Sequence, residues 1–184
     1  TADDGLHGKE VDLRGKHGPT VLGTDNLMMA AVLAEGTTVI ESAAAEPEVV
    51  DLANFLNKMG AKIEGAGTRR VTITGVKKLH GVEHTVIPDR IVAGTFMVAA
   101  AMAGCPEQGV VLNRVCREDL EPSTDKLIEA GHSVEFNAKG TSCTVTPGKS
   151  PKGVNIVTAP FPGFPTDMQA QFTALLAVTP GISV

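Results

Sequence analysis

The protein has 184 residues, a net charge of −5 and 42% hydrophobic residues, which is enough apolar material for a substantial core. Its acidic balance and scattered Lys and Arg residues argue against nucleic acid as a partner. It has no run of about 18 apolar residues, so we expect no membrane-spanning segment, and its first ten residues lack a signal-peptide core. Three scattered cysteines (Cys105, Cys116 and Cys143) favour a reducing cytoplasmic environment over a disulfide framework.

An internal repeat of 71 residues organises the chain, with copies that begin at Gly23, Gly94 and Pro165. In each copy the pattern predicts an apolar helix rich in small residues, then a glycine-bearing turn and a β-branched strand. The third copy contains only this first helix and strand. We therefore expect the chain to be a piece of a longer protein.

The first two copies continue with a second helix and a hairpin. An amphipathic helix over Glu46–Gly60 is expected to end at Gly60 in the left-handed region, and Glu121–Gly131 is its counterpart. The hairpins that follow would turn at Gly65 and Gly67 in the first copy and at Gly140 in the second.

Two further strands are predicted ahead of the later copies, over Val82–Val86 and Val154–Val157. Each complete copy then reads strand, helix, strand, helix, strand, strand. This order predicts an α/β (α+β) fold of repeated βαβαββ modules, in which a parallel crossover is followed by a hairpin.

The run FPGFPTDMQAQF, residues 161–172, contains the strongest candidate for chemistry. One interpretation is structural: Thr166 caps the following helix, and Asp167 is favoured there by the helix dipole. The repeat supports this interpretation, because Thr24 and Asp25 occupy the same places in the first copy. The other interpretation is a rigidly held carboxylate that acts as a general base.

Other motifs carry weaker signals. The loop KHGPTVLGTDN, residues 16–26, could offer backbone donors to an anion or simply connect a strand to a helix. His80 and His84 lie in a segment with strand character, so they would not share a face, and we expect no metal site. Neither Cys105 nor Cys116 has a basic flanking segment of the kind that lowers a thiol pKa, although Arg114 and Arg117 lie close to Cys116 in the sequence.

Three segments resemble the UDP-N-acetylglucosamine 1-carboxyvinyltransferase (enolpyruvyl transferase) family, part of the EPSP synthase superfamily. They are LAEGTTVIESAAAEPEVVDLANFLNKMGAKIEGAGT, VIPDRIVAGTFMVAAA and TAPFPGFPTDMQAQFTALL, at residues 33–68, 86–101 and 158–176. The resemblance implies an inside-out α/β barrel with two domains of three modules each. About two and a half modules would be present: residues 1–88 as the last module of one domain, and 89–184 as the first module and part of the next module of the other.

The resemblance also implies a reaction. In this family the enolpyruvyl group of phosphoenolpyruvate is transferred to the 3′-hydroxyl of UDP-N-acetylglucosamine, phosphate is released, and no metal or organic cofactor takes part. The residue that matches Asp167 accepts the hydroxyl proton, and the one that matches Thr166 lies at the sugar. Thr20 and Val21 match a nucleotide-binding stretch.

This chain departs from the family at Gly18 and Pro19, where many relatives carry Lys and Val, and at Leu22, where they often carry Gly. The family's reactive cysteine has no counterpart in the contexts of Cys105, Cys116 or Cys143. We therefore expect this chain alone to be inactive. Because the third copy stops after one helix and one strand, we also expect uncovered apolar faces through which the chain self-associates. The alternatives are a nucleotide-sugar-binding piece, a purely structural fragment, and a 5-enolpyruvylshikimate-3-phosphate synthase-like enzyme.

Overall fold

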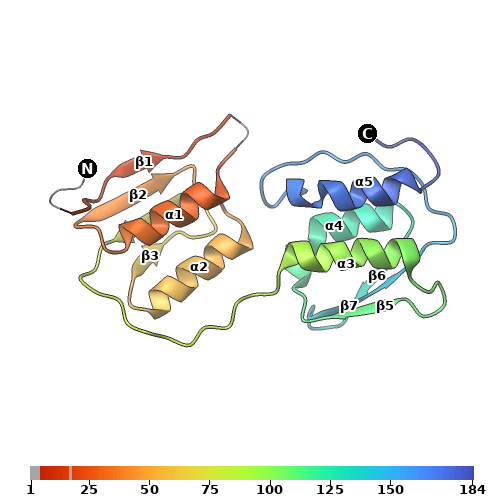
Figure 1. Ribbon diagram of the computed structural model, residues 1–184, viewed down its shortest axis with the longest axis horizontal. Coiled ribbons are helices and arrows are strands. Elements are labelled where there is room, and N and C mark those ends of the chain that lie inside the picture. The colour runs from red at the N-terminus through yellow and green to blue at the C-terminus, as the bar shows by residue number, and fades with distance from the viewer. Residues whose placement is uncertain (1–4, 17) are drawn as a thin grey trace. The chain divides into compact units, whose positions relative to one another are not determined.

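The computed structural model describes residues 5–16 and 18–184. The chain forms two compact units, Thr1–Ile87 and Pro88–Val184. Each unit has a hydrophobic core of its own, built between its helices and its sheet (Figure 1). No helix in the described part of the chain is long and apolar enough to cross a membrane.

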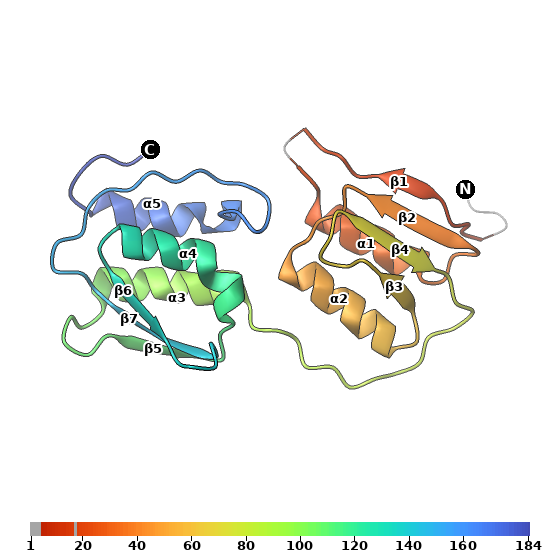
Figure 2. The same cartoon turned by 180° about the vertical axis from the view of Figure 1, so that it is seen from behind.

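The first unit contains one complete βαβαββ module. Its elements are β1 (Glu10–Asp12), α1 (Val21–Ala31), β2 (Thr37–Glu41), α2 (Pro47–Lys58), β3 (Lys62–Glu64) and β4 (Arg70–Thr74). The strand order is β1-β2-β4-β3, with β1 parallel to β2 and the other neighbours antiparallel. Both helices lie on the same face of this sheet (Figure 2). The predicted parallel crossover and closing hairpin are both confirmed.

The second helix of this module follows the sequence pattern closely. Pro47 stands at its first position, where a missing N–H costs nothing, and Val49, Ala53 and Leu56 are buried on one face. The chain leaves the helix at Gly60 with a φ of +100°, a conformation that costs a residue with a Cβ. The predicted left-handed end of the helix is confirmed.

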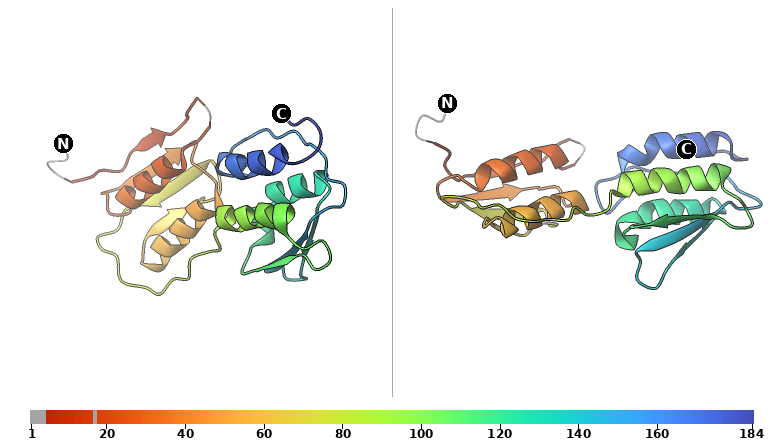
Figure 3. Two further views of the ribbon diagram at one scale, coloured as in Figure 1. Left: turned by 45° about the vertical axis from the view of Figure 1, so that its right-hand side comes forward. Right: turned by 60° about the horizontal axis from the view of Figure 1, so that its bottom comes forward.

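The second unit lacks a first strand. Its elements are α3 (Arg90–Ala103), β5 (Val110–Asn113), α4 (Arg117–Glu129), β6 (Ser133–Phe136), β7 (Ser142–Thr146), the 3₁₀ helix η1 (Thr166–Met168) and α5 (Gln169–Ala177). The sheet order is β5-β7-β6, and both pairings are antiparallel. Helix α3 contacts both α4 and α5, so α5 extends the helical layer beside it (Figure 3).

Three predicted strands are wrong. Residues 82–86 and 154–157 form no strand, and no strand follows α5 in the third copy, because a strand needs a ladder of backbone bonds to a neighbour. The segments after β7 and after α5 are instead joined by isolated backbone bonds: the Gly153 amide donates to the Pro180 carbonyl at 2.9 Å, and the Ile156 amide donates to the Val184 carbonyl at 2.8 Å.

Helix α4 begins four residues before its predicted start at Glu121. The first turn carries Glu118 and Asp119, whose charges favour a helix N-terminus, and Pro122 is accommodated inside the helix. Pro122 lacks one backbone donor, and this loss did not end the helix. The start of α4 is therefore better indicated by Glu118 and Asp119 than by the position of Pro122.

Candidate functional site

Asp167 lies in η1, at the start of the helix α5 that carries the candidate site. The loop before it is tight: the Gly163 amide donates to the Pro160 carbonyl at 2.8 Å, and the Ala159 amide donates to the Phe164 carbonyl at 2.9 Å. The side chain of Asp167 is exposed to solvent and accepts no hydrogen bond within the described chain. A carboxylate in this setting is free to meet a ligand.

Thr166 does not cap the helix, so this part of the structural interpretation is wrong. Pro165 is the N-cap residue of η1, and no side chain accepts a capping hydrogen bond there. The Met168 amide instead donates to the Pro165 carbonyl at 3.1 Å. Thr166 is exposed beside Asp167, so the two polar side chains open to solvent from the same turn.

Apolar packing holds this turn in place. Met168 is fully buried. Its sulfur and terminal methyl pack so closely on Gly94 of α3 that a Cβ added at Gly94 would lie only 2.9 Å from each of them. Phe164 and Phe172 meet edge to face with ring centroids 5.0 Å apart. Asp167 is therefore positioned by the buried residues on either side of it in the chain.

A polar contact adds to this anchoring. The Gln171 side-chain amide donates to Thr95 Oγ1 at 2.9 Å, and Thr95 Oγ1 donates to the Ile91 carbonyl at 2.7 Å. This chain of bonds joins α5 to α3. It gives the amide nitrogen of Gln171 a partner on the neighbouring helix.

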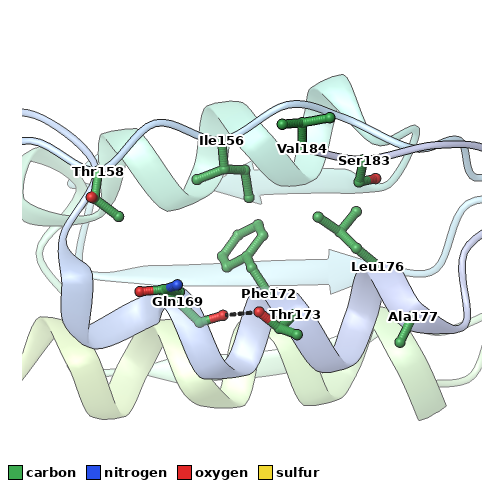
Figure 4. A pocket seen from close by; sticks show the side chains of 9 residues that line it. All are labelled: Ile156, Thr158, Gln169, Phe172, Thr173, Leu176, Ala177, Ser183 and Val184. Carbon is green, nitrogen blue, oxygen red and sulfur yellow. Dashed lines mark hydrogen bonds between the residues drawn. The ribbon is translucent and has the colours of Figure 1, made fainter.

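A cavity of about 440 Å³ opens along α5, two residues beyond Asp167. Figure 4 shows Phe172 and Leu176 of the helix facing Ile156 and Val184 across it, with Gln169 at one end. Its full lining is Ile156, Thr158, Gln169, Phe172, Thr173, Leu176, Ala177, Ser183 and Val184. Asp167 is not among these residues, so the cavity and the carboxylate are separate features of the unit.

The other two candidate residues start helix α1 in the first unit. Thr20 is its N-cap: Oγ1 accepts from the Gly23 amide at 3.2 Å, and the Thr20 carbonyl accepts from the Thr24 amide at 3.0 Å. Val21 is the first helical residue and packs against the core of the unit. The loop before them is closed by two backbone bonds between Gly15 and Gly18, and residue 17 lies outside the described residues.

Thr24 and Asp25 lie inside α1, so their predicted place at the helix start is wrong. Thr24 is fully buried, and its Oγ1 accepts from the Ala44 amide at 3.0 Å. The Oδ1 atom of Asp25 is buried without a hydrogen-bond partner. Burial raises the pKa of Asp25, and the nearby carboxylates of Glu48 and Glu46 raise it further.

The three thiols occupy different settings: Cys105 is exposed, Cys116 half-buried and Cys143 buried. Burial, together with a hydrogen bond from Sγ to Glu118 Oε2 at 3.2 Å, raises the pKa of Cys116 to about 11. Arg114 and Arg117 do not offset these effects. Almost no thiolate is present at neutral pH, which is the opposite of an activated nucleophile.

No group of three or more His, Cys, Asp or Glu side chains in residues 5–16 and 18–184 is arranged to hold a metal ion. His80 is exposed, and its Nδ1 atom lies 3.1 Å from the carbonyl oxygen of the neighbouring Gly81. His84 lies against Asp51 of α2, with Nε2 and Oδ1 2.9 Å apart. Sequence reasoning missed this pair, because 33 residues separate its members.

The fold and the comparisons together define a family of carboxyvinyl transferases. The family model described as EPSP synthase (3-phosphoshikimate 1-carboxyvinyltransferase) matches residues 2–184, and the chain belongs to this family.

Among curated relatives, the UDP-N-acetylglucosamine 1-carboxyvinyltransferase of Akkermansia muciniphila is 70% identical over 183 residues, which cover 100% of this chain and 42% of the relative. UDP-N-acetylglucosamine 1-carboxyvinyltransferase 2 of Carboxydothermus hydrogenoformans is 58% identical over 167 residues, 90% of this chain and 39% of its own length. The chain thus spans about two fifths of the length of these relatives, and the resemblance stated from the sequence is confirmed.

Solved structures agree on the fold. The enolpyruvyl transferase NikO from Streptomyces tendae matches with a TM-score of 0.80 and 25% identity, over 96% of this chain and 43% of that one. An EPSP synthase from Acinetobacter baumannii matches with a TM-score of 0.58 and 23% identity, over 93% and 38%. The predicted fold class is confirmed.

Proposed function

We propose that the full-length protein transfers the enolpyruvyl group of phosphoenolpyruvate to the 3′-hydroxyl of UDP-N-acetylglucosamine with release of phosphate. The observation that carries this proposal is the 70% identity, over the whole chain, to a relative named for that reaction. The exposed carboxylate of Asp167 supports it, because addition of a hydroxyl to an alkene carbon needs an acceptor for the hydroxyl proton.

In this proposal Asp167 is the general base. It takes the proton of the 3′-hydroxyl as the sugar oxygen bonds to the carbon of phosphoenolpyruvate that carries the phosphate. The neighbouring methylene carbon gains a proton and becomes a methyl group. Loss of that proton and of phosphate then restores the double bond. A carboxylate fixed by the buried Phe164 and Met168 on either side reorganises little during this step.

The other predicted residues bind substrate in this scheme. Thr166 opens from the same turn as Asp167 and offers its hydroxyl to the sugar. Thr20 and Val21 start helix α1, and the positive end of its dipole favours the phosphate groups of a nucleotide, although Thr20 Oγ1 already accepts from the Gly23 amide. No organic cofactor or metal takes part, and both substrates are compounds of the cytoplasm, where we place the protein.

We further propose that residues 1–88 form the last module of one domain, and that residues 89–184 form the first module of the next domain with part of its second. The complete βαβαββ module of the first unit supports the first assignment. The order α3-β5-α4-β6-β7, followed by a new helix at α5, supports the second.

The test compares Asp167→Asn with Asp125→Asn in the full-length protein. Asp125 is an exposed carboxylate on α4 and serves as the matched control. Phosphate release from phosphoenolpyruvate should depend on UDP-N-acetylglucosamine and fall by about 10²- to 10⁴-fold in Asp167→Asn alone. Turnover with shikimate 3-phosphate in place of the nucleotide sugar would favour the sibling synthase and contradict the proposal. An unchanged rate of phosphate release in Asp167→Asn would contradict the assignment of Asp167 as the general base.

The 184-residue chain by itself should not turn over, because burial raises the pKa of both Cys116 and Cys143, which is the opposite of a reactive cysteine. Calorimetric titration with UDP-N-acetylglucosamine should show weak or undetectable binding. Micromolar affinity without turnover would instead make the chain a self-sufficient nucleotide-sugar-binding module.

A further inference from the structure

Residues 75–89 connect the two units without forming a helix or a strand. The first part of this connection is held by backbone hydrogen bonds. The amides of Gly75, Val76 and His80 donate to the carbonyls of Gly36, Val32 and Met59, each at 2.9 Å. Leu79 also packs against the core of the first unit. The connection is therefore fixed to that unit as far as residue 80.

Beyond residue 80, His84 holds the connection to the unit by its side chain. Every other residue from 81 to 86 is exposed, whereas the His84 side chain is only 8% exposed. Its Nε2 atom lies 2.9 Å from Asp51 Oδ1, its Nδ1 atom lies 3.2 Å from Lys58 Nζ, and its ring centroid lies 5.2 Å from that of Phe55.

The three partners of His84 form one stripe on helix α2. Asp51, Phe55 and Lys58 follow each other at spacings of four and three, which places them on the same helical face. Together they offer an acceptor, a flat apolar surface and a donor in line along the helix. An imidazole matches this order, because it has two polar edges and an apolar ring.

The chemistry of the partners fixes the proton on the ring. A lysine ammonium group can only donate hydrogen bonds, so Nδ1 of His84 accepts from Lys58. The remaining ring nitrogen, Nε2, then carries the proton and donates it to the carboxylate of Asp51. The Asp51 side chain is 13% exposed and depends on this donor for a partner in a largely dry setting.

We propose that His84 is a latch that fixes residues 81–84 to helix α2 and so sets the length of free chain between the two units. Asp89 caps helix α3, so with the latch closed the free tether is residues 85–88, and the chain from His84 to Asp89 spans at most about 17 Å when extended. With the latch open, the free tether is residues 81–88, and the chain from His80 to Asp89 spans at most about 31 Å. One side chain thus nearly doubles the reach of the tether.

Backbone ¹⁵N relaxation of the 184-residue protein tests the latch, because it reports the mobility of each amide directly. In the unaltered protein, residues 81–84 should have order parameters near about 0.85, as in rigid backbone, and His84→Ala should lower them below about 0.6. His80→Ala is the matched control, since this exposed histidine lies in the same connection and its Nδ1 atom meets the neighbouring Gly81 carbonyl rather than a side chain of α2. It should leave the order parameters unchanged.

Two further variants separate a latch from general damage. In His84→Gln a side-chain amide can still donate to Asp51, so mobility should lie between that of the unaltered protein and that of His84→Ala. Lys58→Ala removes the donor to Nδ1, and imidazole ¹⁵N shifts should report loss of the pure Nε2-protonated form while α2 stays folded.

Several outcomes would overturn the proposal. Residues 81–84 could already be mobile in the unaltered protein, His84→Ala could leave them rigid, or the imidazole could carry its proton on Nδ1. If His84→Ala unfolds the first unit, the decision rests on His84→Gln and Lys58→Ala. Unchanged order parameters in His84→Gln, together with unchanged imidazole ¹⁵N shifts in Lys58→Ala, would then refute the latch.

Discussion

The dipeptide Thr-Asp occurs twice at the same position of the repeat, and the two units use it in opposite ways. Thr24 and Asp25 lie inside α1, where Thr24 is fully buried and one oxygen of Asp25 is buried without a partner. Thr166 and Asp167 lie in the first turn before α5, and both are exposed. The same residues are part of the interior in one unit and an accessible polar pair in the other.

The difference follows from where each helix starts. The copies are 142 residues apart, two repeats of 71, so Pro162 and Pro165 correspond to Thr20 and Gly23. In the first unit the Gly23 amide is available to be capped by Thr20, and α1 begins at Val21. Pro162 has no hydroxyl to cap a first turn, and Pro165 disfavours the helical conformation in Phe164 before it, so this helix starts later and Asp167 lies in its first turn. The later start of the second helix leaves the Asp167 carboxylate exposed, whereas the earlier start of α1 places Asp25 inside that helix.

The largest expected effect tests whether packing, rather than a cap, positions Asp167. Phe172 is 1% exposed and meets Phe164 edge to face. Phe172→Ala should lower the free energy of unfolding of the second unit by about 3–5 kcal/mol and loosen the loop before η1. Urea denaturation followed by amide resonances of that unit measures both effects.

Phe96→Ala is the control, because this phenylalanine of α3 is 61% exposed. It should change the free energy of unfolding by less than about 0.5 kcal/mol. Equal losses in the two variants would show that the buried ring pair has no special part in holding the site.

Much of the fold was predictable because it rests on local signals. The helix face over Glu46–Gly60, the turn at Gly60 and the hairpin at Gly140 each carry their own pattern, and each formed as expected. Residues 82–86 have the composition of a strand, yet a strand requires a neighbour that composition does not specify.

The motif around Asp167 marks it as a candidate, and its role stays a prediction. Its support by Gly94 and Thr95 could not be read from the sequence, because it depends on contacts more than 70 residues apart. The pairing of Asp51 with His84 was missed for the same reason. Single-sequence patterns report spacing along one element, whereas these contacts join two.

The next largest effect contrasts the two threonines. Thr24→Val should lower the free energy of unfolding by about 1–3 kcal/mol, because the buried Ala44 amide loses its acceptor. Thr166→Val should change it by less than about 0.5 kcal/mol, because Thr166 is exposed and caps nothing. Chemical denaturation of both variants measures the contrast. A comparable loss in Thr166→Val would restore Thr166 as a structural residue.

A smaller effect concerns the start of α1. Thr20→Ala removes the cap on the Gly23 amide and should cost about 1 kcal/mol of unfolding free energy. Thr20→Ser retains the hydroxyl and should restore most of that loss. Thermal denaturation of the pair measures the cap. If both variants behave like the unaltered protein, the hydroxyl of Thr20 has no structural role and remains available to a ligand.

The smallest effect has the opposite sign and depends on pH. Because the pKa of Asp25 is raised in the folded protein above its usual 3.8, the folded state holds this proton more tightly than the unfolded state does. The stability linked to that proton is present below about pH 3.8 and is lost as the pH rises through the folded pKa. Asp25→Asn removes this group, and with it the charge that burial and the neighbouring carboxylates disfavour.

Asp25→Asn should raise the free energy of unfolding at pH 7 by up to about 1 kcal/mol, since the side chain is only partly buried, and the gain should shrink as the pH falls toward 4. Asp167→Asn, which alters an exposed side chain, should change stability by less than about 0.5 kcal/mol at pH 7. Denaturation of the two variants across this pH range measures the difference. A loss of stability in Asp25→Asn would mean that Asp25 has a partner in solution, and the contrast between the buried and the exposed carboxylate would no longer hold.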